Sequence, residues 1–85
     1  MASVRHLTLD VLKPHQPNAL EFAQALAGLG PGYEVRVRVT EVDEHTETLL
    51  VTIDGEALDF ERINEAIEAN GGSLHSIDEV VVHSE

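Results

Sequence analysis

The chain has 85 residues, which is long enough for one small domain and too short for two. Of these residues 42% are hydrophobic and 25% charged, which is typical of a globular protein. It contains no cysteine, which excludes disulfides, thiolate zinc sites and iron–sulfur clusters. Sixteen aspartates and glutamates against five lysines and arginines give a formal net charge of −11, and this field repels nucleic-acid phosphates and anionic membrane surfaces. We therefore expect neither a nucleic acid nor a membrane as a partner.

The first half of the chain predicts a strand followed by a helix. Leu7, Leu9 and Val11 alternate with polar residues, which is the pattern of a half-buried strand. From Asn18 onward apolar residues recur every three or four positions, as in an amphipathic helix that has Pro17 in its first turn and ends at "GLGPG". The apolar positions of this helix are Ala19, Phe22, Ala23, Leu26 and Leu29.

The second half predicts a hairpin, a helix and a last strand. Alternating residues over 33–40 and 48–53 predict two strands, joined by the polar turn "DEHTE". Asp59 is a natural N-cap and Gly71 a natural C-terminal residue for the second helix, whose buried stripe is Phe60, Ile63, Ala66 and Ile67. The last strand, about 74–83, carries apolar groups on both faces. Either a bulge near Asp78 or burial of both faces explains this pattern.

The order of these elements, βαββαβ, predicts an α+β fold over residues 1–85. Two right-handed βαβ halves give a ferredoxin-like sandwich, with an antiparallel sheet of order 4-1-3-2 and both helices on one face. The helix-covered face is expected to hold Leu7, Leu9, Val11, Val35, Val37, Val39, Leu49, Val51 and Ile53. The uncovered face is expected to hold His6, Thr8, Asp10, Arg36, Arg38, Thr48, Leu50 and Thr52.

This topology gathers charged residues from distant segments at one end of the sheet: Asp10, Lys13, His15, Asp43, Glu44, His45, Glu47 and His75. Calcium and magnesium prefer carboxylate oxygens, which Asp10, Asp43, Glu44 and Glu47 could supply. Imidazoles at His15, His45 or His75 would instead favour zinc or another transition metal. These residues are candidate ligands of a divalent cation. The sequence favours the other interpretation, a solvated turn without a metal, because no spacing matches an EF-hand or a helical zinc pair.

The sequence shows no pattern typical of an enzyme. Ser73 and Ser76 lie near His75 only in sequence, and there is no Gly-x-Ser-x-Gly nucleophile motif. The glycines of "GLGPG" do not follow a strand, as those of a phosphate-binding loop would. We expect no catalytic activity.

Four motifs, taken in order, resemble an archaeal domain-of-unknown-function family, number 211. They are "LDVLKPH" from Leu9, "VDEHTE" from Val42, "LDFERINEAIEANGG" from Leu58 and "HSIDEVV" from His75, and the likeness covers about residues 3–82. The resemblance implies a ferredoxin-like subunit of homo-oligomeric rings that admits bound divalent cations such as calcium, and it implies no enzymatic activity. The single lysine, Lys13, points to a haloarchaeal member.

The composition predicts where the protein is found, and the edges of the sheet predict how it assembles. Dispersed carboxylates with almost no lysine are typical of a salt-rich cytoplasm, where ions screen self-repulsion; the alternative is a cation-binding protein. The first ten residues lack the apolar stretch of a secretory signal, which also favours the cytoplasm. The apolar edge Val80, Val81 and Val82 and the basic edge Arg36 and Arg38 predict a closed homo-oligomer. The alternative function is a regulatory module that binds a divalent cation or a small ligand.

Overall fold

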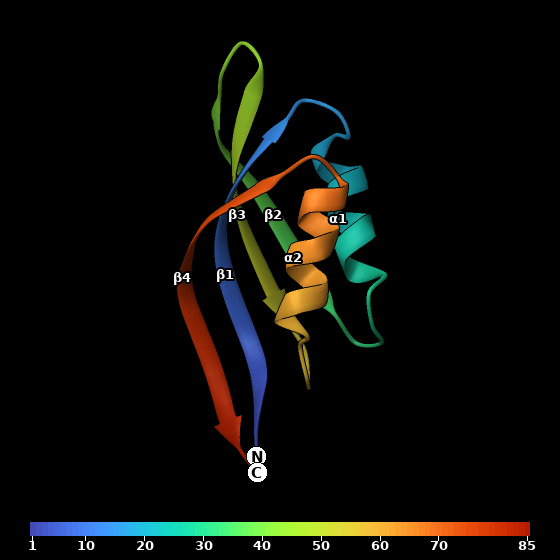
Figure 1. Ribbon diagram of the computed structural model, residues 1–85, viewed down its shortest axis with the longest axis vertical. Helices are drawn as coiled ribbons and strands as arrows, with labels where there is room; N and C mark the ends of the chain where they lie inside the picture. The colour runs from blue at the N-terminus through green and yellow to red at the C-terminus, as the bar shows by residue number, and fades with distance from the viewer.

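A computed structural model describes all 85 residues, and it contains the six predicted elements in the predicted order (Figure 1). The predicted strands and helices are confirmed, although the first strand is longer than its alternating segment. The elements are β1 (Ala2–Pro14), α1 (Ala19–Ala27), β2 (Glu34–Val42), β3 (Thr46–Asp54), α2 (Phe60–Ala69) and β4 (Ser73–Ser84).

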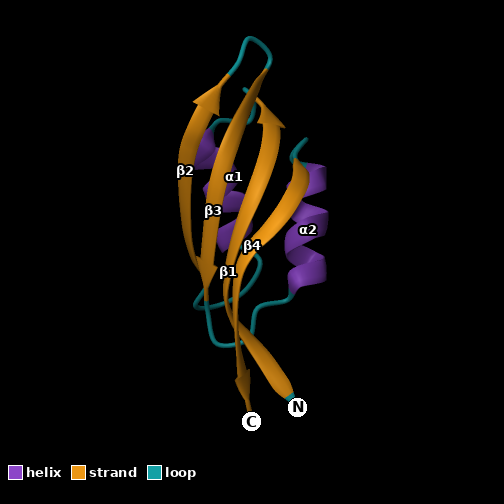
Figure 2. Ribbon diagram, turned by 90° about the vertical axis from the view of Figure 1, so that its left-hand side faces the viewer, coloured by secondary structure: helices purple, strands orange, loops and turns teal.

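The four strands form one antiparallel sheet in the order β2-β3-β1-β4, which is the predicted order. Both helices lie on the same side of the sheet, so the opposite face is not covered by the chain (Figure 2). This βαββαβ arrangement is the ferredoxin-like sandwich. The two open edges of the sheet are β2 and β4.

The helix ends follow from local chemistry. The Asn18 side chain accepts a hydrogen bond from the Glu21 N–H, and the Glu21 carboxylate accepts one from the Asn18 N–H, which completes a capping box. Pro17 therefore precedes the N-cap of α1, and its expected place in the first turn is wrong. Asp59 caps α2 by accepting from the Arg62 N–H, and Gly71 takes the left-handed conformation after this helix, with φ +84°.

The core lies between the sheet and the two helices, and its residues are apolar. Val39, which we expected in it, is 39% exposed, although its neighbour Leu49 on β3 is fully buried, because Val39 lies on the edge strand β2. The buried apolar residues are Leu7, Leu9, Val11, Phe22, Leu26, Leu49, Val51, Ile53, Leu58, Ile63 and Ile67.

Two bulges break the alternation of β4. Thr8 pairs with Glu79 and Leu9 with Ile77, so Asp78 is an extra residue, as the bulge interpretation predicted. A second register shift makes His75 an extra residue as well. Burial of both faces, the other interpretation, is wrong, since Val80, Val81 and Val82 are 52%, 48% and 53% exposed.

The two ends of the chain form a narrow ribbon at one end of the molecule. Pairing of β1 with β3 begins at His6, whereas its pairing with β4 extends to Ala2 and Ser84. The termini lie side by side at the tip, where the Glu85 N–H donates to the Met1 carbonyl at 2.9 Å (Figure 1). Apolar side chains of β4 thus lie on a part of the sheet that neither helix covers.

Candidate functional site

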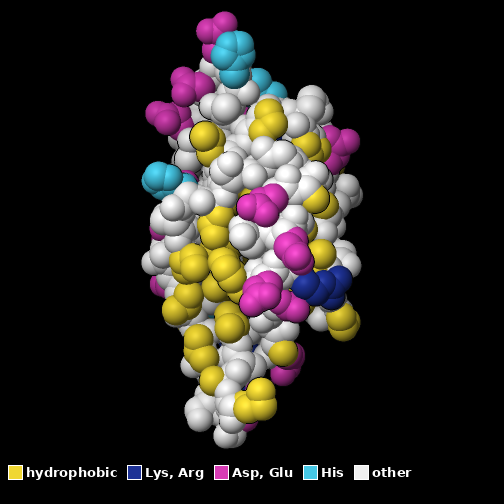
Figure 3. All heavy atoms as spheres, viewed as in Figure 1, with side chains coloured by type: hydrophobic (Ala, Val, Ile, Leu, Met, Phe, Trp, Pro, Cys, Tyr) yellow, Lys and Arg dark blue, Asp and Glu magenta, His cyan; other side chains and the backbone are white.

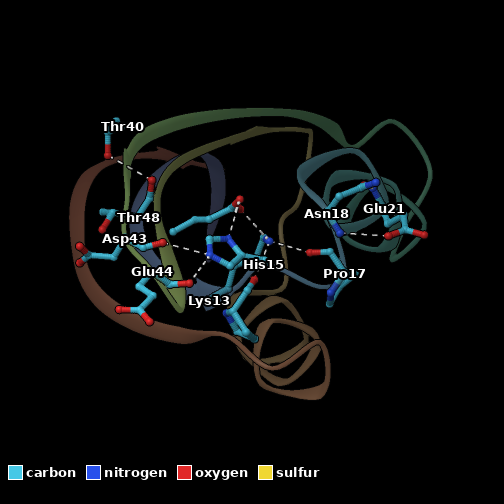
Figure 4. Close-up of polar contacts among 11 residues, drawn as sticks. Lys13, His15, Pro17, Asn18, Glu21, Thr40, Asp43, Glu44 and Thr48 are labelled. Carbon is cyan, nitrogen blue, oxygen red and sulfur yellow. Dashed lines mark hydrogen bonds and ion pairs between the residues drawn. The ribbon is translucent and has the colours of Figure 1, made fainter.

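The end of the sheet that carries the β2–β3 hairpin is built around a buried lysine. Lys13 is 1% exposed, and its ammonium donates to three acceptors: the carbonyls of Pro14 and Pro17 at 2.9 and 2.6 Å, and Glu47 Oε1 at 2.9 Å (Figure 4). All three N–H groups are therefore used. This complete pairing is what allows a charged group to be buried.

His15 extends this cluster to the tip of the hairpin. Its Nδ1 lies 3.3 Å from Glu47 Oε2, and its Nε2 lies 3.0 and 3.1 Å from the carbonyl oxygens of Asp43 and Glu44 (Figure 4). Both ring nitrogens face only acceptors, so the geometry favours the imidazolium, which has two N–H donors. The hydrogen bond to Glu47 is the main reason that the pKa of His15 is raised.

Glu47 lies between two cations, and this determines what the cluster can do. Hydrogen bonds from Lys13 first and His15 second lower the pKa of its carboxyl group. Each oxygen of this carboxylate is bonded to one of the two cations. The cluster therefore links the hairpin to the segment between β1 and α1. Both Glu47 oxygens, which we expected to bind a metal, are hydrogen-bonded to Lys13 and His15 instead.

The residues of the predicted cation site lie in two places. Glu47 and the backbone of Asp43 and Glu44 surround His15, whereas Asp10 and His75 line a hollow of about 250 Å³ on the uncovered face, together with Leu12 and Thr48. His45 is separate from both, with its side chain 85% exposed. No three His, Asp or Glu side chains come together in a geometry that suits a metal ion. The calcium or magnesium site stays a prediction, which calorimetric titration of chelator-treated protein tests.

A second histidine cluster, on the uncovered face, was not predicted. His6 Nδ1 lies 2.6 Å from Asp54 Oδ1, and His6 Nε2 lies 2.7 Å from Glu79 Oε1 and 3.1 Å from the Thr8 hydroxyl. These contacts join β3, β1 and β4. The bond to Asp54 is the largest cause of a raised His6 pKa, with Glu79 adding to it against some desolvation. Alternation placed His6 on this face, but only the strand register brings Asp54 and Glu79 to it.

Comparison with known proteins identifies the family. The model of the family DUF211, described as "Uncharacterized ArCR", matches residues 5–85. The chain belongs to the DUF211 family. The uncharacterized protein MJ0319 of Methanocaldococcus jannaschii is 47% identical to it over 81 residues, which are 95% of this chain and 84% of the relative. The predicted resemblance is confirmed, and neither the family nor this relative carries an assigned function.

The surface of this DUF211 chain has an unusual distribution of cations. Its one lysine is buried, and none of its four arginines forms an ion pair within the chain. Arg36 and Arg38 are exposed on the edge strand β2 and belong to the uncovered face, because they pair with Thr52 and Leu50. Neither helix of the DUF211 chain is long and apolar enough to cross a membrane.

Proposed function

We propose that this protein is a cytoplasmic structural subunit, without a catalytic role, that assembles into a closed homo-oligomer by joining β4 of one copy to β2 of the next. The observation that carries the proposal is the apolar edge of β4. Ile77, Val80, Val81 and Val82 are each about half exposed, at 48%, 52%, 48% and 53%. Apolar side chains gather on the surface formed by the lower part of this strand (Figure 3).

Such an edge is normally protected. Unpaired N–H and C=O groups on an apolar edge strand are a template for another strand, and proteins usually block them with charges, proline or a covering element. Between Ile77 and Ser84 the only charged side chains of β4 are Asp78 and Glu79, apart from a histidine. The apolar triplet that follows has no such block, which supports pairing with another chain.

Charge supports the joining of unlike edges rather than like ones. Two β4 edges side by side would bring Asp78 and Glu79 of both copies together, and two β2 edges would bring Arg36 and Arg38 together. Joining β4 to β2 instead places the acidic edge beside the basic one. Such a head-to-tail contact leaves the joined pair with one free β2 edge and one free β4 edge, so further copies can add until the rotation between copies closes the assembly.

Domain size supports the same proposal. A domain of this length buries only about 60% of the surface of its unfolded chain, so its own core is marginal. Only 13 of the 85 residues are buried in the single chain. Pairing both edges in an assembly would bury the half-exposed valines and add to the stability of each copy.

Mass measurement by light scattering at molar potassium chloride tests the proposal, with several copies per particle as the expected result. Ile77 and Val80 lie on the helix-covered side of the sheet, as Val35 and Val37 of β2 do. The variant carrying Ile77→Lys and Val80→Lys should be a folded monomer, because its two ammonium groups would have to be buried beside those valines of the next copy. Leu20→Lys, at a 66% exposed position of α1 and on neither edge strand, is the matched control and should assemble normally. A monomeric wild-type protein at both low and molar salt would overturn the proposal.

A further inference from the structure

The strand register aligns charged residues in two rows that run across the uncovered face. In one row Arg38 on β2 is level with Leu50, then with Asp10 on β1, and then with Ser76 on β4. The other row runs through Arg36, Thr52, Thr8 and Glu79. Each row therefore begins with an arginine at one edge and has a carboxylate at or beside the opposite edge.

Asp10 is the carboxylate of these rows that has no partner within the chain. Its side chain is half-buried, and it makes no side-chain hydrogen bond or ion pair within the chain, although the hollow that it lines also holds Thr48 and His75. The neighbouring Ser76 hydroxyl donates to Asp78 instead, at 2.6 Å. A carboxylate that has no donor within the chain is available to a cation seated in the hollow, with which it can form a charge-assisted hydrogen bond.

Glu79 differs from Asp10 in this respect. Its carboxylate already accepts from His6 at 2.7 Å, so Arg36 of a neighbour would compete with an existing bond. Arg38 and Asp10 have no competing partner, because neither belongs to any ion pair of the chain. The pair with the largest gain on assembly is therefore Arg38 with Asp10.

We propose that the hollow lined by Asp10, Leu12, Thr48 and His75 is a guanidinium site that Arg38 of a second copy completes. This inference rests on the proposed joining of β4 to β2, and it names the contact that selects the partner edge and its register. A guanidinium fits the lining, because its N–H groups can donate to the Asp10 carboxylate in a charge-assisted pair.

The strand geometry places the two groups within reach. Because β4 runs antiparallel to β1, and β2 runs parallel to β1, a second copy added in the same orientation lays its β2 antiparallel to β4. Asp10 is then two strand spacings, about 10 Å, from the backbone of that β2. An arginine and an aspartate extended towards each other bridge this span, and the small Ser76 side chain between them leaves the path open.

A charge-exchange experiment tests the site. Asp10→Arg sets two arginines against each other at every contact, and Arg38→Asp sets two aspartates together. We expect either variant alone to need a protein concentration at least about tenfold higher for half-assembly, measured by light scattering at one fixed potassium chloride concentration. A chain with both substitutions should regain assembly, because each contact again joins opposite charges whatever the number of copies.

Controls separate this inference from the proposed function. Arg62→Asp on α2 makes the same charge change away from the sheet and should assemble like the wild type, and circular dichroism establishes that each variant is folded. If the wild type assembles and the single variants do so equally well, the guanidinium site is wrong and the edge pairing stands. If the single variants dissociate and the chain with both substitutions stays dissociated, the pairing of Arg38 with Asp10 is wrong. A monomeric wild type overturns both proposals.

Discussion

The Nζ of Lys13 lies 2.9 Å from Oε1 of Glu47 in an ion pair whose two side chains are 0% and 17% exposed. The pair joins β1 to β3, strands that are far apart in sequence and adjacent in the sheet. Its lysine is the only one in the chain, so no lysine remains on the surface. The single lysine of the sequence therefore has a structural role in the folded chain.

Replacing this lysine should destabilise the fold strongly. Lys13→Met leaves the Glu47 carboxylate and the carbonyls of Pro14 and Pro17 without their donor, and breaking one side of a buried pair costs about 3–5 kcal/mol. Because Glu47 keeps some contact with solvent and with His15, we expect the lower end of this range. Urea denaturation measures the free energy of unfolding.

Two further variants make that measurement specific. Arg62→Met removes an exposed cation and should change the free energy of unfolding by less than about 0.5 kcal/mol. Adding Glu47→Leu to Lys13→Met removes the unpaired carboxylate and should recover part of the loss. A Lys13→Met protein as stable as the Arg62→Met protein would show that the pair contributes nothing.

Stability should fall as the pH rises above neutrality. The pKa values of His6 and His15 are raised from 6.5 in the folded chain, so their contribution is complete below pH 6.5 and is lost as the pH rises through the folded pKa values. The pKa of Glu47 is lowered from 4.5, so its contribution is present above pH 4.5 and is lost as the pH falls through its folded value. The melting temperature should therefore decline at both ends of a pH series.

His6→Gln separates the two histidines in that series. Glutamine stays neutral, so the variant lacks the cation between Asp54 and Glu79, and its melting temperature should depend less on pH above 6.5 than that of the wild type. The remaining decline comes from His15. Equal slopes for the wild type and His6→Gln above pH 6.5 would mean that the folded chain does not favour protonated His6.

Stability should rise with salt. The net charge of −11 makes the carboxylates of the folded chain repel one another. Its four arginines form no ion pairs with these carboxylates. The screening length falls from about 10 Å at 0.1 M salt to about 3 Å at 1 M. We expect the melting temperature to climb between these potassium chloride concentrations, and a flat profile would contradict adaptation to salt.

Hydrogen exchange should distinguish central from edge strands. The backbone of β1 and β3 is paired on both sides, so the amides of Leu7–Val11 and Leu49–Ile53 should exchange most slowly. The amides of β2 that face outward should exchange faster in the monomeric Ile77→Lys, Val80→Lys variant and become protected in the assembled wild type. Protection confined to β2 in the monomer would be inconsistent with the strand order.

Local patterns in the sequence were enough to predict the fold. Alternation of apolar residues depends on the two-residue period of a strand, and caps such as Asn18 and Asp59 act within a single helical turn, so both can be recognised without tertiary contacts. The chirality of βαβ units then leaves few topologies, and the predicted strand order is the observed one. The same patterns showed that His6, Asp10 and Arg38 share a face.

Only the tertiary structure decided which charged groups meet. The sequence placed Lys13, His15 and Glu47 at one end of the sheet, but it could not show that both cations bind the Glu47 carboxylate. It also placed Asp10 and His75 at that end, whereas the register and a bulge bring them to a separate hollow. Alternation specifies the face of a strand, but a contact depends on the register between strands, and one extra residue in β4 changes every pairing beyond it.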